Sequence, residues 1–280
     1  MSSLTIRPMS RDEIPWAIEQ AAREGWNPGL HDAVCFYQAN PEGFLIGLLD
    51  GLPIGCISAV AYPENFGFIG LYIVLPEQRG RGYGIQLWQA AMRRLAGYNV
   101  GLDGVVAQQA NYGKSGFRLA YRNIRYEGIS ANMPPPASLH PLHQIAPELL
   151  AAYDRQVFPA SRPDFLRAWV GLAGSRGLAC MAHGALQGYG VIRPCRQGYK
   201  IGPLFADTPA LAESIYAGLT APLPDGSPVF LDVPENNPAA LALAESRAMT
   251  RVFETARMYT GAFPALALEK QFGITSFELG

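Results

Sequence analysis

The feature that most constrains this chain is a glycine-rich turn between a strand-like run and a helix-like run. Residues 66–75 are almost entirely apolar, and residues 82–95 carry apolar side chains at helical spacing. The turn region holds three glycines and two arginines, namely Arg79, Gly80, Arg81, Gly82 and Gly84. A strand, such a turn and a helix in this order aim backbone N–H groups at one point, at the positive end of the helix dipole. The sequence therefore predicts a site here for a phosphate or pyrophosphate group.

The spacing within this turn differs from two common phosphate-binding patterns. A P-loop needs GxxxxGK[ST], but the Lys-Ser pair of this chain, Lys114-Ser115, is preceded by a single nearby glycine, Gly113. The dinucleotide pattern GxGxxG fails because position 85 is Ile85. The spacing present, Arg79-x-x-Gly82-x-Gly84, resembles the acyl-CoA pyrophosphate motif Q/R-x-x-G-x-G/A of the GNAT acetyltransferase superfamily.

The elements around the turn agree with this resemblance over residues 4 to about 128. Alternating or apolar runs predict strands at 4–7, 44–49, 54–62, 66–75, 98–102 and 117–126. Helical spacing predicts helices at 14–21, 82–95 and 108–115, and residues 25–43 are expected to form a loop. The segment from Tyr112 to Phe117 resembles the family's Y-x-x-x-G-F helix end. Val105 and Gln108 depart from the pattern, because many members carry Asn and Ala there.

A proline run, Met133 to Pro136, predicts a boundary between two domains, residues 1–130 and 137–280. The second half repeats the order, with strands predicted at 178–182, 188–193, 199–205, 229–233 and 256–261 and helices that begin near 208 and 237. We expect an α+β chain of tandem GNAT folds, each a mixed, mainly antiparallel sheet flanked by helices. A dissimilar second domain is the alternative. Residues 206–209 contain no glycine turn, so the second half is expected to be degenerate and not to bind CoA in the usual manner.

The resemblance implies acetyl-CoA as co-substrate and assigns residues to it. Backbone groups of Ile73, Val74 and Leu75 would pair with the pantetheine arm. The pyrophosphate would lie on the turn and the helix start, at Arg79, Gly80, Arg81, Gly82, Tyr83, Gly84 and Ile85. Tyr112 would lie near the sulfur as general acid, because a phenol with a pKa of about 10 is protonated at neutral pH. The alternative is that the Tyr112 ring only packs against the sheet.

The acceptor side of the site is marked by fewer residues. The candidates for acceptor binding are Trp26, Asn27, His31, Asp32 and Tyr72. His31 or Asp32 could bind an ammonium group or accept its proton; loop capping is the alternative for both, and core packing is the alternative for Trp26. Residues 66–75 contain no carboxylate, so the general base is not assigned. Because ligand pockets often lie between domains, we expect the second half to cover the acceptor cleft.

Composition limits the classes of partner and function. The net charge is −1 over 280 residues, so neither nucleic acid nor an anionic membrane is an expected partner. Cys35, Cys56, Cys180 and Cys195 show no CxxC spacing, which predicts reduced thiols in a cytoplasmic protein and no metal site. The predicted function is an acyl-CoA-dependent N-acetyltransferase in which a small amine attacks the thioester directly. The alternative is a CoA-binding or regulatory module with weak transfer.

Overall fold

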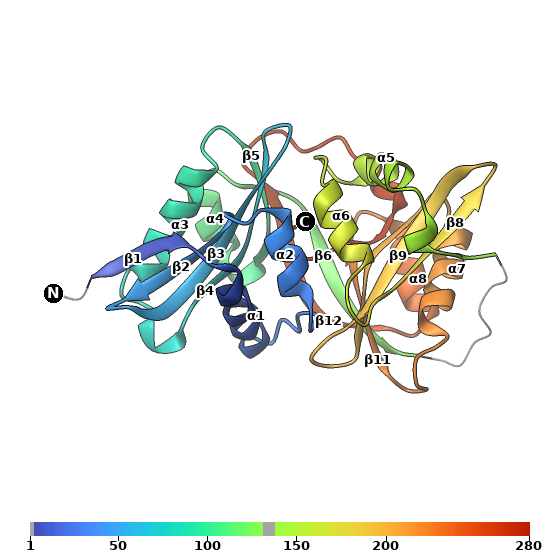
Figure 1. Cartoon of the computed structure of the whole chain (residues 1–280), viewed down its shortest axis with the longest axis horizontal. Coiled ribbons are helices and arrows are strands. Elements are labelled where there is room, and N and C mark those ends of the chain that lie inside the picture. The colour runs from blue at the N-terminus through green and yellow to red at the C-terminus, as the bar shows by residue number, and fades with distance from the viewer. Residues whose placement is uncertain (1–2, 131–137) are drawn as a thin grey trace.

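The computed structural model describes residues 3–130 and 138–280, and the strands in these ranges form one continuous sheet (Figure 1). We call residues 3–130 the N-terminal half and residues 138–280 the C-terminal half. The predicted boundary at Met133 to Pro136 lies outside the described residues. The thirteen described strands follow the order β1-β2-β3-β4-β5-β12-β6-β11-β10-β9-β8-β7, with β13 beside β10.

Both halves supply strands of the predicted kind. The N-terminal half contains β1 (Leu4–Pro8), β2 (Phe44–Leu49), β3 (Leu52–Tyr62), β4 (Phe66–Val74), β5 (Asn99–Val105) and β6 (Arg118–Ile129). The C-terminal half contains β7 (His140–Pro141), β8 (Arg176–Ala182), β9 (Ala185–Pro194), β10 (Tyr199–Ala206), β11 (Pro228–Pro234), β12 (Thr250–Tyr259) and β13 (Gln271–Gly273). The β4–β5 and β10–β11 pairs are parallel and the other pairs are antiparallel, which confirms a mixed, mainly antiparallel sheet.

Each half places a long strand inside the sheet of the other half. Strand β12 lies between β5 and β6 and pairs with both. Strand β6 pairs on its other side with β11, from Asn123 to Ile129. Both neighbours of β6 therefore belong to the C-terminal half. Figure 1 shows β6 and β12 next to each other in the centre of the molecule.

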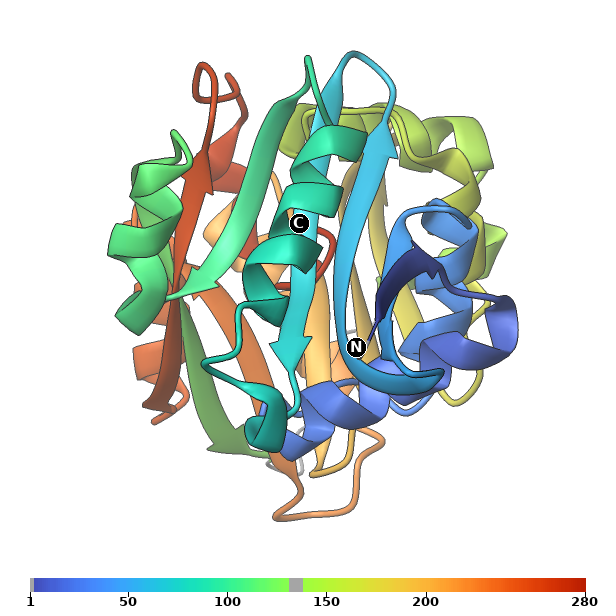
Figure 2. The same cartoon turned by 90° about the vertical axis from the view of Figure 1, so that its left-hand side faces the viewer.

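Helices cover both faces of the sheet. In the N-terminal half, α1 (Ile14–Arg23) packs on β4 and on α2 (Asp32–Ala39), α3 (Tyr83–Arg94) packs on β2, β3 and β4, and α4 (Gln109–Lys114) packs on β5. In the C-terminal half, α5 (Pro147–Val157) packs on β9, α6 (Pro163–Val170) packs on α2, α7 (Pro209–Thr220) packs on β8 to β10, and α8 (Pro238–Ser246) packs on β11. Figure 2 shows α3 lying across the sheet of the N-terminal half.

Local signals fix the starts of three helices, and tertiary packing supplies three other helices that the pattern did not indicate. A capping box of Ser10 and Glu13 precedes α1, and the side chains of Thr208 and Asn237 accept backbone N–H bonds at the starts of α7 and α8. The expected loop 25–43 contains α2, and α5 and α6 precede β8. Helix α2 buries side chains against α6 of the other half, so its sequence carries no simple amphipathic stripe.

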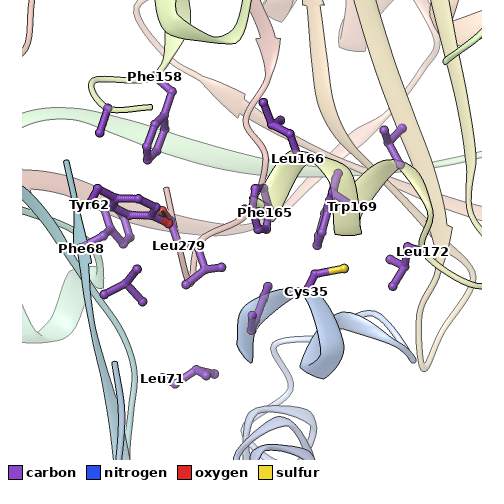
Figure 3. Packing of buried hydrophobic residues seen from close by; sticks show 14 of the residues in the cluster. Cys35, Tyr62, Phe68, Leu71, Phe158, Phe165, Leu166, Trp169, Leu172 and Leu279 are labelled. Atoms are coloured by element: carbon purple, nitrogen blue, oxygen red, sulfur yellow. Dashed lines mark hydrogen bonds between the residues drawn. The ribbon is translucent and has the colours of Figure 1, made fainter. Parts of the chain in front are cut away.

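An apolar cluster joins the halves (Figure 3). Figure 3 shows side chains of α6, among them Phe165 and Trp169, pointing toward Cys35 of α2. The rings of Phe36 and Trp169 are stacked with 6.4 Å between centroids. The two halves therefore share a hydrophobic core.

Buried arginine–carboxylate pairs also cross between the halves. Their members are Asp32 with Arg193, Arg125 with Asp232, and Asp103 with Arg257, at closest nitrogen–oxygen distances of 2.8, 2.6 and 2.6 Å. Each of these side chains is at most 6% exposed. Loss of one member leaves a buried charge without its partner, which is more costly than loss of an exposed pair.

We expect Asp32→Asn to lower the free energy of unfolding by about 3–5 kcal/mol, because Arg193 stays buried without its counter-charge. Urea unfolding followed by circular dichroism measures the effect. The matched control is Asp164→Asn, which breaks an exposed pair with Arg167 and should cost less than about 1 kcal/mol. Equal losses in the two variants would contradict a special role for the buried pair.

Candidate active site

A pocket opens where β4 and β5 separate. The two strands pair in parallel from Phe66 and Asn99 to Ile69 and Leu102, and the pairing stops there. Beyond this point residues 69–72 and 102–105 line opposite walls of a pocket of about 60 Å³. Such a volume holds a few water molecules, so it fits the reacting ends of small molecules. The C-terminal half completes the wall with Phe253, Thr255, Phe277 and Glu278.

A bulge in β4 determines which side chains enter the pocket. Between Ile73 and Gly70 the register with β3 shifts by one extra residue on β4. Leu71 takes up this shift at φ 46°, in the left-handed region that a buried leucine rarely adopts. Strain of this kind persists where the surrounding structure holds it, and it often marks a functional site. The next residue, Tyr72, lines the pocket.

Three aromatic rings form one wall of the pocket. The Trp88 ring of α3 lies 5.5 Å from the ring of Tyr72 and 5.5 Å from that of Tyr112, centroid to centroid. Gly104 makes room for Tyr112, because an added Cβ would lie 2.3 Å from its ring. The Trp88 Nε1–H donates to Ser115 Oγ at 3.0 Å, which fixes the central ring.

The hydroxyls of Tyr72 and Tyr112 have no hydrogen-bond partner in the described part of the chain. Burial raises the pKa of Tyr112 to about 12, and the neighbouring Tyr72 adds to this shift. Burial also raises the pKa of Tyr72. Because a raised pKa keeps a phenol protonated, both groups can donate a proton at neutral pH.

The glycine-rich turn presents unsatisfied amides next to this wall. Gly80 and Gly82 have φ of 76° and 79°, and an added Cβ at either would meet no protein atom within 4 Å. Backbone conformation, not packing, therefore requires glycine at both positions. Gly82 is the N-cap of α3 and has no side chain to cap the first amides, which also lack acceptors within the helix. These features fit an anion cradle.

The two arginines of the turn lie at its rim. The Arg79 Nε–H donates to the carbonyl of Val74 at 2.8 Å, and its guanidinium pairs with Glu24. Arg81 bonds Gln78 at 3.4 Å and is exposed. Ile73 and Val74 pair with β3, and no β5 partner continues on the opposite edge of β4. Leu75, just past the strand, donates its N–H to Ile54.

The equivalent place in the C-terminal half is closed. Strands β10 and β11 pair in parallel from Tyr199 to Ile201, and β13 then pairs with Leu204 and Phe205 where β4 has a free edge. Helix α7 starts with the Thr208 side chain accepting the Leu211 N–H, and Pro209 lacks an N–H. These contacts leave no cradle like that of α3.

The structure brings two of the five expected acceptor residues, Trp26 and Tyr72, to the pocket. Asn27 instead pairs with the backbone of Gln197, and His31 is exposed at the start of α2. Asp32 accepts from Arg193 and from the Gly29 N–H, and its buried side chain does not line the pocket. Asn27 and Asp32 therefore join the two halves.

Arg125 of β6 holds the backbone of Trp26 at the pocket. The Arg125 guanidinium donates to the Trp26 carbonyl at 2.7 Å and forms two bonds to Asp232. It also lies 4.7 Å from the ring centroid of Phe277. The sequence gives no sign of the other pocket residues, Phe253, Thr255, Phe277 and Glu278, because no local pattern shows that residues so distant in the chain share a pocket with β4.

Comparisons with known proteins identify the family of this chain. A family model described as "Acetyltransferase (GNAT) family" matches residues 11–117, and "Acetyltransferase (GNAT) domain" matches residues 150–273. Holothin acyltransferase from Pseudoalteromonas sp. (strain SANK 73390) is 30% identical over 277 residues, which cover 99% of this chain and 94% of that protein. The chain belongs to the GNAT acyltransferase family. Members of this family generally use acetyl-CoA or another acyl-CoA.

Solved structures show the same fold. A putative acetyltransferase from Pyrococcus horikoshii gives a TM-score of 0.85 at 24% identity and covers 99% of this chain and 96% of its own. A tandem GNAT protein from the clavulanic acid biosynthesis pathway gives 0.64 at 13% identity, over 93% and 100%. The tandem GNAT fold of this acyltransferase is thus confirmed. None of its described helices is long and apolar enough to span a membrane.

Proposed function

We propose that this acyltransferase moves an acetyl group from acetyl-CoA to a small amine, which attacks the thioester directly. The proposal is supported by two features that lie along β4. The open amides of the turn follow the end of this strand, and Tyr112, whose hydroxyl has no partner among the described residues, lines the pocket beside the β4 bulge. A pyrophosphate on residues 79–85 would direct the pantetheine arm along residues 73–75 toward that pocket.

The protein positions the two substrates and supplies a proton. The amine nitrogen forms a bond to the carbonyl carbon, the carbon–sulfur bond breaks, and its electron pair goes to sulfur. Tyr112 donates its proton to that sulfur and regains one from water. Net reaction of an ammonium acceptor releases one proton to solvent. General acid catalysis of this kind is worth about 100- to 10,000-fold.

The pocket favours an acceptor with an apolar or aromatic body. The aromatic residues Trp26, Phe253 and Phe277 line the pocket, and they come from both halves. The relative is named for holothin, so holothin is the first acceptor to test. A thiol-release assay with acetyl-CoA and holothin, tyramine, tryptamine, putrescine or glycinamide tests the proposal. Thiol release that no amine accelerates would favour the CoA-binding module instead.

We expect Gly82→Val to weaken acetyl-CoA binding at least about tenfold, or roughly 1.4 kcal/mol. Valine at φ 79° is strained, and its side chain enters the space beside the free amides. Calorimetric titration compares the variants and also gives a stoichiometry, expected to be one per chain because the C-terminal half has no open cradle. Gly226→Val is the matched control, since Gly226 has φ 75° and open space but lies outside the turn. Undiminished affinity in Gly82→Val would remove the turn from the binding site.

A further inference from the structure

The segment after β13 carries the C-terminal half into the pocket of the N-terminal half. The Ile274 N–H donates to the carbonyl of Asp232, and the Tyr62 hydroxyl donates to the carbonyl of Leu279 at 3.1 Å. Arg162 donates to the carbonyl of Gly280. Figure 3 shows Leu279 beside Tyr62, between the strands of the N-terminal half and α6. Hydrogen bonds at both ends thus fix the position of the residues between them.

Glu278 lies directly on β4 at the point where β4 leaves β5. A Cβ added to Gly70 would lie 2.3 Å from the Glu278 carbonyl oxygen and 2.8 Å from its Cα. Gly70 is the first residue of β4 beyond the last parallel pair, Ile69 with Leu102. The glycine therefore permits this close approach and brings Glu278 to the pocket wall.

Two carboxylates line the pocket among the described residues, and only one of them is free to take a proton. Asp103 accepts from Arg257 Nε at 2.9 Å, from Arg257 Nη2 at 2.6 Å and from Asn123 at 2.7 Å. Glu278 has no hydrogen bond or ion pair in the described ranges. The carboxylate oxygens of Glu278 reach accessible space, although the residue as a whole is only 4% exposed.

We propose that Glu278, supplied by the C-terminal half, is the general base that takes a proton from the acceptor ammonium in this pocket. The inference rests on the proposed amine acetylation. The carboxylate takes one N–H proton, the nitrogen lone pair then forms the carbon–nitrogen bond, and the carbon–sulfur pair leaves on sulfur, which Tyr112 protonates. The second N–H proton goes to water when the amide forms, Glu278 returns its proton to water, and Tyr112 takes one back, so that one proton is released in all.

The electrostatic surroundings set the pH at which this base works. Burial raises the pKa of Glu278. Charged groups that act on it come from four further elements: Lys200 of β10, Arg125 of β6 and Arg193 of β9 lower the pKa, and Asp32 of α2 raises it. The pocket adds Asp103, Tyr72 and Tyr112. The base is the charged form, so kcat/KM should fall as pH falls through this pKa. The fall should occur at a higher pH than for a glutamate with the ordinary pKa of about 4.3.

The test compares Glu278→Gln with Glu278→Asp, using acetyl-CoA and the panel amine that gives the fastest thiol release. At pH 7 we expect Glu278→Gln to lower kcat by about 100- to 10,000-fold, with unchanged acetyl-CoA affinity and without the acidic limb of the pH profile. Glu278→Asp should keep the limb with intermediate activity. Glu269→Gln, at an exposed position just before β13 and outside the pocket, should match the wild type.

Gly70→Ala provides a second route that keeps every pocket side chain. Its Cβ should displace the Glu278 backbone, lower kcat and shift the acidic limb. Wild-type kcat in folded Glu278→Gln or Gly70→Ala would overturn the inference. A higher acceptor KM in Glu278→Gln, with the acidic limb of the pH profile intact, would also overturn the inference. That result would indicate that Glu278 binds the acceptor ammonium group and does not take its proton. A wild type that acetylates no panel amine would instead overturn the proposed function.

Discussion

A chain that ends at residue 130 should fail to form a folded fragment that binds acetyl-CoA. Strand β6 pairs only with β11 and β12 among the described strands, so in the fragment β6 would lose all of its backbone hydrogen bonds to neighbouring strands. Strand β5 would also lose β12 and expose a new edge beside the pocket. The core shared by α2 and α6 would be open to water. We therefore expect aggregation or loss of cooperative unfolding.

Circular dichroism, gel filtration and calorimetric titration of the fragment test this expectation. Co-expression of residues 1–130 and 131–280 as separate chains is the control, because strand pairing should reassemble the two halves and restore binding. A monomeric fragment with cooperative unfolding and full-length acetyl-CoA affinity would show that the N-terminal half folds alone. The pairing of β6 and β12 with strands of the other half would then not be needed for the N-terminal half to fold.

The sequence predicted the parts of the fold that depend on neighbours in the chain. Helix α3 follows the predicted apolar spacing, and β4 ends one residue before its predicted end at Leu75. The fold class could also be predicted, because the Arg79-x-x-Gly82-x-Gly84 spacing occurs between these two elements. Caps and periodicity act within a few residues, so a single sequence displays them directly.

The sequence could not predict contacts that depend on the other half. β12 begins at Thr250, six residues before the predicted strand, because pairing with β6 extends it. Asp32 has the polar character of a loop residue, yet Arg193 makes it a buried interface charge. Glu278 follows no motif, and only the close approach to Gly70 places it at the pocket. Each of these contacts joins residues more than one hundred positions apart.

Tyr112→Phe should lower kcat by about 100- to 10,000-fold while acetyl-CoA affinity changes little. The substitution removes the hydroxyl, but the phenyl ring can keep its place on Gly104 and beside Trp88. Burial, reinforced by Tyr72, raises the pKa of Tyr112 to about 12. The phenol therefore stays protonated as pH rises toward that value. Deprotonation of Tyr112 should thus not lower the wild-type rate between pH 7 and about 10.

Stopped-flow thiol release at saturating acetyl-CoA measures the chemical step in this variant. The ratio of wild-type to Tyr112→Phe rates should stay constant over that pH range, because the same protonated group is absent throughout. Tyr98→Phe, outside the pocket, serves as the control for loss of a phenol oxygen. Tyr72→Phe is the decisive comparison, since Tyr72 carries the other pocket hydroxyl that has no partner among the described residues. A large loss in Tyr72→Phe together with a normal rate in Tyr112→Phe would assign the acid to β4 and leave Tyr112 as a packing residue.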